Sequence, residues 1–265
     1  MSAIHPLSEQ ELYEQAPSLF APMPYKGASE RYHFIPTIEV IERMRQQGWY
    51  PVSVQEAGVR IREKEGFQRH LVRLRHFEEL FAPSGNAVEL LLFNSHDRST
   101  AFSVSVGIYR FVCANGLVVS ESVFETYRIR HIGERHSDVE EAVNRVSAFK
   151  PKLQRKIERF GRLRLSEQER QAFARAAIPL RFQEHLHVPP LQLLLPHREE
   201  DESDDLYTVM NVIQENLIRG GLSGRNEETG RPFTSRELKS LPATVAVNRG
   251  LWSLAERIAH IKEAA

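Results

Sequence analysis

The sequence predicts an α+β protein: an antiparallel β-meander covered by helices, with a C-terminal helical extension. Short segments alternate between polar and apolar residues, polar turns separate them, and the second half of the chain carries apolar residues at helical spacing. The 265 residues suffice for one large domain or a core with a smaller unit. We predict an extended arm (1–30), an α+β core (31–180), a Leu/Pro-rich and acidic connector (181–205) and a helical extension (206–265).

Capping signals place the first helices. Ser8 and Glu11 have the spacing of a capping box for a short helix within the arm. Thr37 is expected to be the N-cap of a helix from about Ile38 to Gln47, and Gly48 is expected to end it.

Alternation then predicts strands at 51–62, 67–77 and 88–94, and the short connections favour an antiparallel meander. In the second strand Arg69, Arg73 and Arg75 fall on one face, opposite His70, Val72, Leu74 and His76. Residues 102–113 fit either a strand or a helix face, and we favour a strand that gives way to a helical turn near Tyr109. Residues 124–131 alternate again, with Arg128 and Arg130 on one side.

Helical periodicity dominates the remainder. Helices are predicted at 138–164, 167–177 and 206–219, and Gly220-Gly221 is the expected stop of the third. Residues 224–234 are predicted to be a loop, and a final helix is expected at about 245–263.

The formal charge is balanced, with 35 basic and 35 acidic side chains, so the chain is not a globally basic nucleic-acid binder. The charges are unevenly distributed: residues 150–164 hold seven Lys/Arg and one Glu, whereas residues 199–205 hold six acids and no base. Cys113 is the single cysteine, which excludes an intramolecular disulfide. No leader or membrane-spanning run is apparent, so we expect a cytoplasmic protein with no membrane partner and no cofactor.

Two groups of cations are candidates for binding a phosphate backbone, because guanidinium and ammonium groups pair with phosphate. The first is an arginine stripe on the strands and the second is the basic helix; together they comprise Arg60, Arg62, Arg69, Arg73, Arg75, Arg128, Arg130, Lys152, Arg155, Lys156 and Arg159. The alternative for the stripe is a sheet face neutralised by nearby acids (Glu56, Glu63, Glu65, Glu78, Glu79). The alternative for the helix is pairing with the acidic run 199–205.

The sequence indicates catalysis and metal binding less strongly than it indicates binding of a phosphate backbone. The contiguous Ser95-His96-Asp97 is expected to be a polar turn, because adjacent residues rarely face one another as a catalytic triad requires. His185, His187 and His197 lack a partner at a known metal-ligand spacing and are expected in a loop. These observations favour a protein that binds over one that catalyses.

Three motifs carry a resemblance to a family of bacterial phage/plasmid-like proteins of unknown function: residues 93–119, 214–221 (QENLIRGG) and 247–252 (VNRGLW). The resemblance covers about residues 25–265. The segment 34–41 (FIPTIEVI), followed by Gly48-Trp49, is also similar to the opening of single-strand annealing proteins of the eukaryotic RAD group, where Ile35, Ile38, Ile41, Gly48 and Trp49 are the matching positions. That second resemblance implies oligomeric rings that hold single-stranded DNA on basic residues.

The leading expectation is therefore a non-enzymatic protein of a mobile element that binds and anneals single-stranded DNA or RNA and forms a homo-oligomer. The alternative is a protein-binding module that modulates the host or counters its defences, in which the acidic run and exposed aromatic residues would carry recognition.

Overall fold

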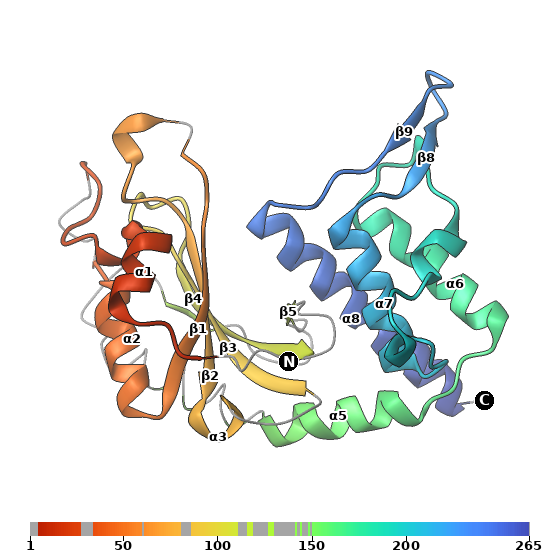
Figure 1. Ribbon diagram of the computed structural model, residues 1–265, viewed down its shortest axis with the longest axis horizontal. Helices are drawn as coiled ribbons and strands as arrows, with labels where there is room; N and C mark the ends of the chain where they lie inside the picture. Colours follow the sequence, from red (N-terminus) through yellow and green to blue (C-terminus); the bar gives the residue numbers. More distant parts are fainter. Residues whose placement is uncertain are drawn as a thin grey trace. The chain divides into compact units, whose positions relative to one another are not determined.

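The computed structural model describes residues 5–27, 34–59, 61–80, 86–110, 116–118, 127–129, 141, 144, 148 and 150–264. The chain divides into two compact units (Figure 1). The first, which we call the sheet unit, comprises Met1–Val118 and Phe124–Lys150, and the second, the helical unit, comprises Val119–Val123 and Pro151–Ala265. Both units mix helices and strands, which confirms the predicted α+β class.

The sheet unit contains the predicted antiparallel meander. Its sheet has the order β1-β2-β3-β4-β5, and β6 also pairs with β4. The strands are β1 (Trp49–Glu56), β2 (His70–His76), β3 (Asn86–Asn94), β4 (Phe102–Arg110), β5 (Gly116–Val118) and β6 (Tyr127–Ile129). The helical turn expected near Tyr109 is wrong, because Tyr109 pairs with Ala87 on one side and Gly116 on the other and so stays extended.

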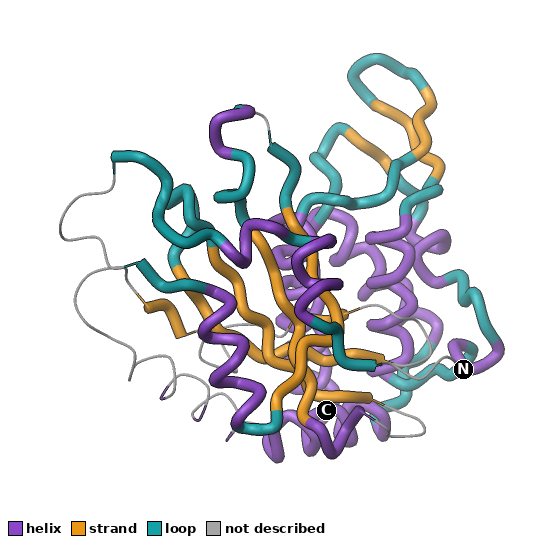
Figure 2. Tube along the Cα trace, turned by 60° about the vertical axis from the view of Figure 1, so that its left-hand side comes forward, coloured by secondary structure: helices purple, strands orange, loops and turns teal. Residues whose placement is uncertain are grey.

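An apolar core lies on one face of this sheet. Cross-strand pairing aligns Val54, Val72, Leu92 and Val104 in one row, and all four are buried. Helices α1 (Glu9–Gln15) and α2 (Thr37–Gln46) lie beside these strands (Figure 2). The shorter helical elements of the unit are η1 (Pro17–Phe20), η2 (Arg62–Lys64) and α3 (Phe77–Leu80).

Local capping explains where α1 and α2 begin. The capping box of Ser8 and Glu11 is present as predicted. The predicted cap of α2 is wrong: Pro36 is the N-cap, and Thr37 is the first helical residue. The Thr37 side chain is fully buried and makes its hydrogen bonds within the core instead.

The helical unit is organised around α7 (Leu206–Arg219), whose residues from Leu206 to Leu217 are all buried. Asp205 caps its start by accepting from Thr208 N, and Gly220 follows its end with a positive φ of 81°. The surrounding elements are α5 (Lys150–Arg162), α6 (Glu167–Ala177), η3 (Ile178–Leu180), β7 (Leu186–His187), η4 (Pro190–Leu194), η5 (Glu199–Asp201), β8 (Ser223–Asn226), β9 (Pro232–Thr234) and α8 (Leu241–Ala264).

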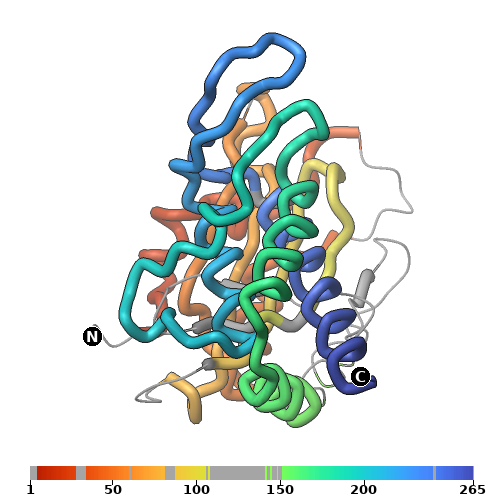
Figure 3. Tube along the Cα trace, turned by 90° about the vertical axis from the view of Figure 1, so that its right-hand side faces the viewer, coloured from red at the N-terminus to blue at the C-terminus, as the bar shows by residue number. Residues whose placement is uncertain are grey.

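Two features of this unit differ from expectation. The predicted loop 224–234 is a β-hairpin of β8 and β9 that projects from the helices (Figure 3). Gly224 permits it, because a Cβ there would lie 2.5 Å from the carbonyl oxygen of His187 on the neighbouring strand. Helix α5 was assigned to the core domain, yet from Pro151 onward it belongs to the helical unit, where Phe160 packs on Trp252 with ring centroids 5.1 Å apart.

Candidate nucleic-acid interface

Two of the strand arginines converge on one carboxylate inside the sheet unit. Register places Arg75 of β2 opposite Glu89 of β3, and Arg73 lies two residues away on the same face. Arg73 Nε donates to Glu89 Oε2 at 2.6 Å, and Arg75 Nη2 donates to Glu89 Oε1 at 2.6 Å. The arginines share a face as predicted, but both pair with Glu89, which is not among the acids expected to neutralise that face.

These three charges are closed off from solvent. The side chains of Arg73, Arg75 and Glu89 are 13%, 0% and 1% exposed. A phosphate backbone requires accessible donors, so Arg73 and Arg75 do not form the continuous exposed stripe that was expected. The sequence does indicate that Glu89 pairs with a cation. It is the single charged residue of Asn86–Asn94, and a carboxylate in a buried strand needs a cationic partner.

The remaining strand arginines lie in different contexts. Arg62 is exposed in η2, and Arg69 is partly exposed just before β2, where its carbonyl accepts from Ala57 N. Arg128 lies in β6, where its backbone pairs with Ser103 of β4. Arg60 and Arg130 lie outside the described residues.

Helix α5 presents the second group of cations. Its buried residues Leu153 and Phe160 define the inner side of the helix. The cations at 152, 155, 156, 159 and 162 recur at steps of three and four residues, which places them along one side of the helix. The structure therefore brings together the four predicted residues of this helix and adds Arg162.

Carboxylates of α8 neutralise part of that side. Lys156 Nζ lies 2.5 Å from Glu256 Oε1, and Arg159 forms a two-point ion pair with Glu263. Hydrogen bonding to Glu263 raises the pKa of the Arg159 guanidinium, and the same contact lowers the pKa of the Glu263 carboxyl. Lys156 and Arg159 thus tie α5 to α8.

The outer part of α5 is more accessible. Lys152 and Arg155 are exposed, and Arg162 is 82% exposed with Glu158 no closer than 3.9 Å. We call Lys152, Arg155 and Arg162 the α5 cationic face. A rise of about 1.5 Å per residue spreads these three groups over roughly 15 Å of helix, a length that spans several nucleotides.

Members of the acidic run 199–205 pair with two different arginines. Arg198 Nη1 lies 2.8 Å from Asp201 Oδ2, and Arg198 Nη2 lies 2.6 Å from Glu215 Oε1. The expected pairing with the basic segment 150–164 occurs at Arg164, which lies 2.7 Å from Asp204. Lys156 and Arg159 pair with α8 instead.

The residues around Ser95-His96-Asp97 form a polar cluster in the core of the sheet unit. The two ring nitrogens of His70 lie 2.8 Å from Ser18 Oγ and from Thr37 Oγ1, and Asn94 Nδ2 donates to Thr37 Oγ1 at 3.0 Å. Burial, and secondarily the nearby His96, lower the pKa of His70 to about 3. Because His70, Ser18, Thr37 and Asn94 are fully buried, the cluster has the character of a structural core and not of a substrate site.

Asp97 does not complete a catalytic triad. Its carboxylate lies 3.2 Å from Lys64 Nζ and accepts from the backbone N of Ser99, so it closes the polar turn that was predicted. Within the described ranges, no group of three or more His, Cys, Asp or Glu side chains is arranged to hold a metal ion.

Comparison with known proteins assigns the chain to a family. Residues 25–252 match the model of a family described as "Domain of unknown function (DUF932)". The chain belongs to the DUF932 family. Two relatives from Escherichia coli K12, the UPF0380 proteins YfjQ and YafZ, are each 37% identical to it over 255 residues, which cover 96% of this chain and 92% of theirs.

The family membership confirms the predicted resemblance to a family of unknown function, and it assigns no activity. No solved structure matches the chain. The resemblance to single-strand annealing proteins stays a prediction. None of the described helices is both long enough and apolar enough to traverse a bilayer.

Proposed function

We propose that this DUF932 protein binds single-stranded DNA or RNA without sequence preference, and that it anneals strands during recombination of a mobile element. The observation that carries the proposal is the α5 cationic face, on which Lys152, Arg155 and Arg162 lie on one side of a helix and are exposed. Guanidinium groups suit this role because they pair with phosphate oxygens and also stack on bases.

The rigidity of α5 supports the same proposal. Leu153 and Phe160 are fully buried, and Lys156 and Arg159 tie the helix to α8. The outward cations therefore project from a fixed scaffold, which reduces the entropy lost when a polyanion binds. Arg73 and Arg75 are not part of this proposed surface, because they share Glu89 in a buried site.

Fluorescence anisotropy with a labelled oligothymidylate over a salt series tests the proposal. Three phosphate contacts on a single strand predict a log–log slope of affinity against salt of about −2. The triple variant Lys152→Ala/Arg155→Ala/Arg162→Ala should lose most of that slope and bind at least about tenfold more weakly at low salt.

The matched control removes three exposed cations elsewhere in the helical unit: Arg175→Ala/Lys239→Ala/Arg257→Ala. It changes the net charge equally and should retain the wild-type slope. Wild-type protein that does not bind the oligonucleotide at about 50 mM salt would refute the proposal, and so would equal losses in the two triple variants.

Annealing further predicts a homo-oligomer. Sedimentation velocity should show an assembly larger than one chain when a long oligonucleotide is present. A single-chain mass with and without the oligonucleotide would contradict the annealing role while leaving simple binding intact.

A further inference from the structure

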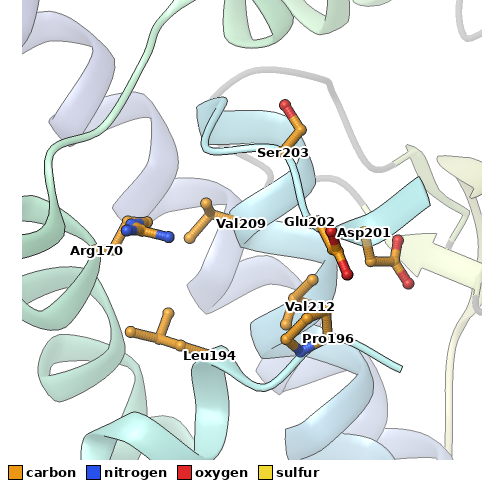
Figure 4. A pocket seen from close by; sticks show the side chains of 8 residues that line it. All are labelled: Arg170, Leu194, Pro196, Asp201, Glu202, Ser203, Val209 and Val212. Carbon is orange, nitrogen blue, oxygen red and sulfur yellow. The ribbon is translucent and has the colours of Figure 1, made fainter. Parts of the chain in front are cut away.

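The helical unit has a small, partly open cavity at its surface, and none of the residues that line it belongs to the α5 cationic face. It measures about 200 Å³. Its lining comes from α6, α7 and the segment between them: Arg170, Leu194, Pro196, Asp201, Glu202, Ser203, Val209 and Val212 (Figure 4). This volume is below the roughly 300–1,000 Å³ of pockets that hold drug-sized ligands, so the cavity suits a smaller molecule.

Arg170 supplies a cationic end of the cavity. Figure 4 shows its guanidinium extending from α6 toward Val209 of α7. Its Nε is buried and has no hydrogen-bond partner among the described residues. A buried guanidinium nitrogen without a partner has lost its hydration, so an acceptor on a bound molecule would restore the missing hydrogen bond.

The opposite side of the cavity carries carboxylates. Asp201 and Glu202 lie across from Arg170 (Figure 4). Asp201 is already engaged by Arg198, whose Nη1 lies 2.8 Å from Asp201 Oδ2. Glu202 is exposed, and no ion pair engages it within the part of the chain that the structure describes. The lining residues for which the described part of the chain shows no ion pair are thus the cationic Arg170 and the anionic Glu202, on opposite walls.

Aliphatic groups separate the two charged ends. Leu194, Pro196, Val209 and Val212 complete the lining, and Val209 and Val212 are buried. They offer an apolar surface to a compact hydrocarbon group. A simple anion would meet Glu202, and a simple cation would meet Arg170, so neither charge alone matches the cavity.

We propose that this cavity binds a small zwitterion, namely a free α-amino acid with an apolar side chain. The α-carboxylate accepts from Arg170, the α-ammonium group donates to Glu202, and the side chain packs against the two valines and Leu194. Charge-assisted hydrogen bonds at both ends and an apolar middle correspond to the three parts of the lining. The site does not depend on the nucleic-acid proposal.

Isothermal titration calorimetry of the full chain with L-leucine tests this site. Two truncated analogues isolate the ends of the ligand: 4-methylpentanoate lacks the ammonium group, and 3-methylbutylamine lacks the carboxylate. Each should bind at least about tenfold more weakly than leucine, because each leaves one charged group of the cavity without its partner.

Substitutions of the two charged lining residues test their roles in binding. Arg170→Met and Glu202→Gln should each weaken leucine binding about tenfold or more, whereas Arg170→Lys should retain part of it. The controls Arg175→Met, on the exposed side of the same helix, and Glu228→Gln, in the hairpin, should bind leucine as the wild type does. Thermal unfolding of each variant verifies that it is folded.

Three results would overturn the proposal: no heat from leucine at about 10 mM, truncated analogues that bind as tightly as leucine, or a free nucleobase such as adenine bound in place of leucine. The last result would reassign the cavity to a base and connect it with nucleic-acid binding.

Discussion

The arginines of β2 and those of α5 have the same side chain but opposite surroundings. Arg73 and Arg75 share Glu89 across a strand pair, and their side chains are only 13% and 0% exposed. On α5, Arg155 and Arg162 are exposed, and Arg159 reaches a carboxylate whose side chain is itself 41% exposed. One set of charges lies inside the sheet unit and the other lies at the surface of the helical unit.

This difference shows that the number of cations in a segment does not predict which of them can bind a ligand. A strand inside a sheet has neighbours on both edges, and cross-strand pairing presents a partner to each side chain. A surface helix buries one side and leaves the other in water. Removing one partner of a buried charge pair destabilises the fold, while exposed charges remain available to a polyanion.

The largest loss of stability is expected on substitution of Glu89. Glu89→Ala leaves Arg73 and Arg75 in a buried site without their shared carboxylate, so the free energy of unfolding should fall by about 3–5 kcal/mol or more. Urea unfolding measures this, and Glu89→Gln serves if the alanine variant does not fold. The control Glu78→Ala, 62% exposed, should change stability by less than about 0.5 kcal/mol.

Removing the arginines as well should recover stability. The combination Glu89→Ala/Arg73→Leu/Arg75→Met replaces the buried charges with apolar groups and should unfold at a higher urea concentration than Glu89→Ala alone. If the triple variant is as unstable as the single one, unpaired charge is not the cause of the loss.

The ion pairs of Arg198 in the helical unit are intermediate in exposure between the buried pairs of Glu89 and the exposed pair of Arg159. Hydrogen bonding to Glu215 raises the pKa of Arg198, whose side chain is 29% exposed, while Glu215 and Asp201 are 8% and 2% exposed. Arg198→Ala should therefore cost about 2 kcal/mol by urea unfolding, because it leaves two poorly hydrated carboxylates. Arg164→Ala, whose partner Asp204 is exposed, should cost less than about 1 kcal/mol; equal losses would show that burial does not decide the outcome.

Acid should destabilise the sheet unit through His70. The folded pKa of about 3 is below the unfolded value of about 6.5, so this contribution to stability is complete above pH 6.5 and is lost as pH falls toward 3. Between pH 7 and pH 4 the loss is on the order of 2–3 kcal/mol. His70→Gln removes the titrating ring and should flatten the pH dependence of urea unfolding; the exposed His187→Gln should leave it unchanged.

The smallest effect is expected for the ion pairs between α5 and α8. Arg159 and Glu263 are 38% and 41% exposed, so Arg159→Ala should cost no more than about 0.5–1 kcal/mol, and less at high salt. Thermal unfolding at low and high salt measures the difference. A loss that does not respond to salt would mean that Arg159 acts through packing of its side-chain stem instead of its charge.

Local signals predicted much of the fold. The predicted bounds of α6 and α7 agree with the structure because each helix has its caps beside it: Ser166 and Glu169 form a capping box, and Asp205 and Gly220 enclose α7. The meander followed from alternation in strands with short connections. The hairpin at 223–234 was missed, because the close approach that Gly224 permits involves a strand more than thirty residues earlier.

The sequence by itself determined the α+β class, the capped helices and the cationic side of α5, since each depends on residues within a few turns or one strand of each other. Only the tertiary structure decided that Glu89 pairs with both Arg73 and Arg75 and that Arg170 faces Glu202 across a cavity. The physical reason is that neighbours in space decide whether a charged side chain is paired and buried or exposed to solvent. Strand register and helix packing bring those neighbours from distant parts of the chain.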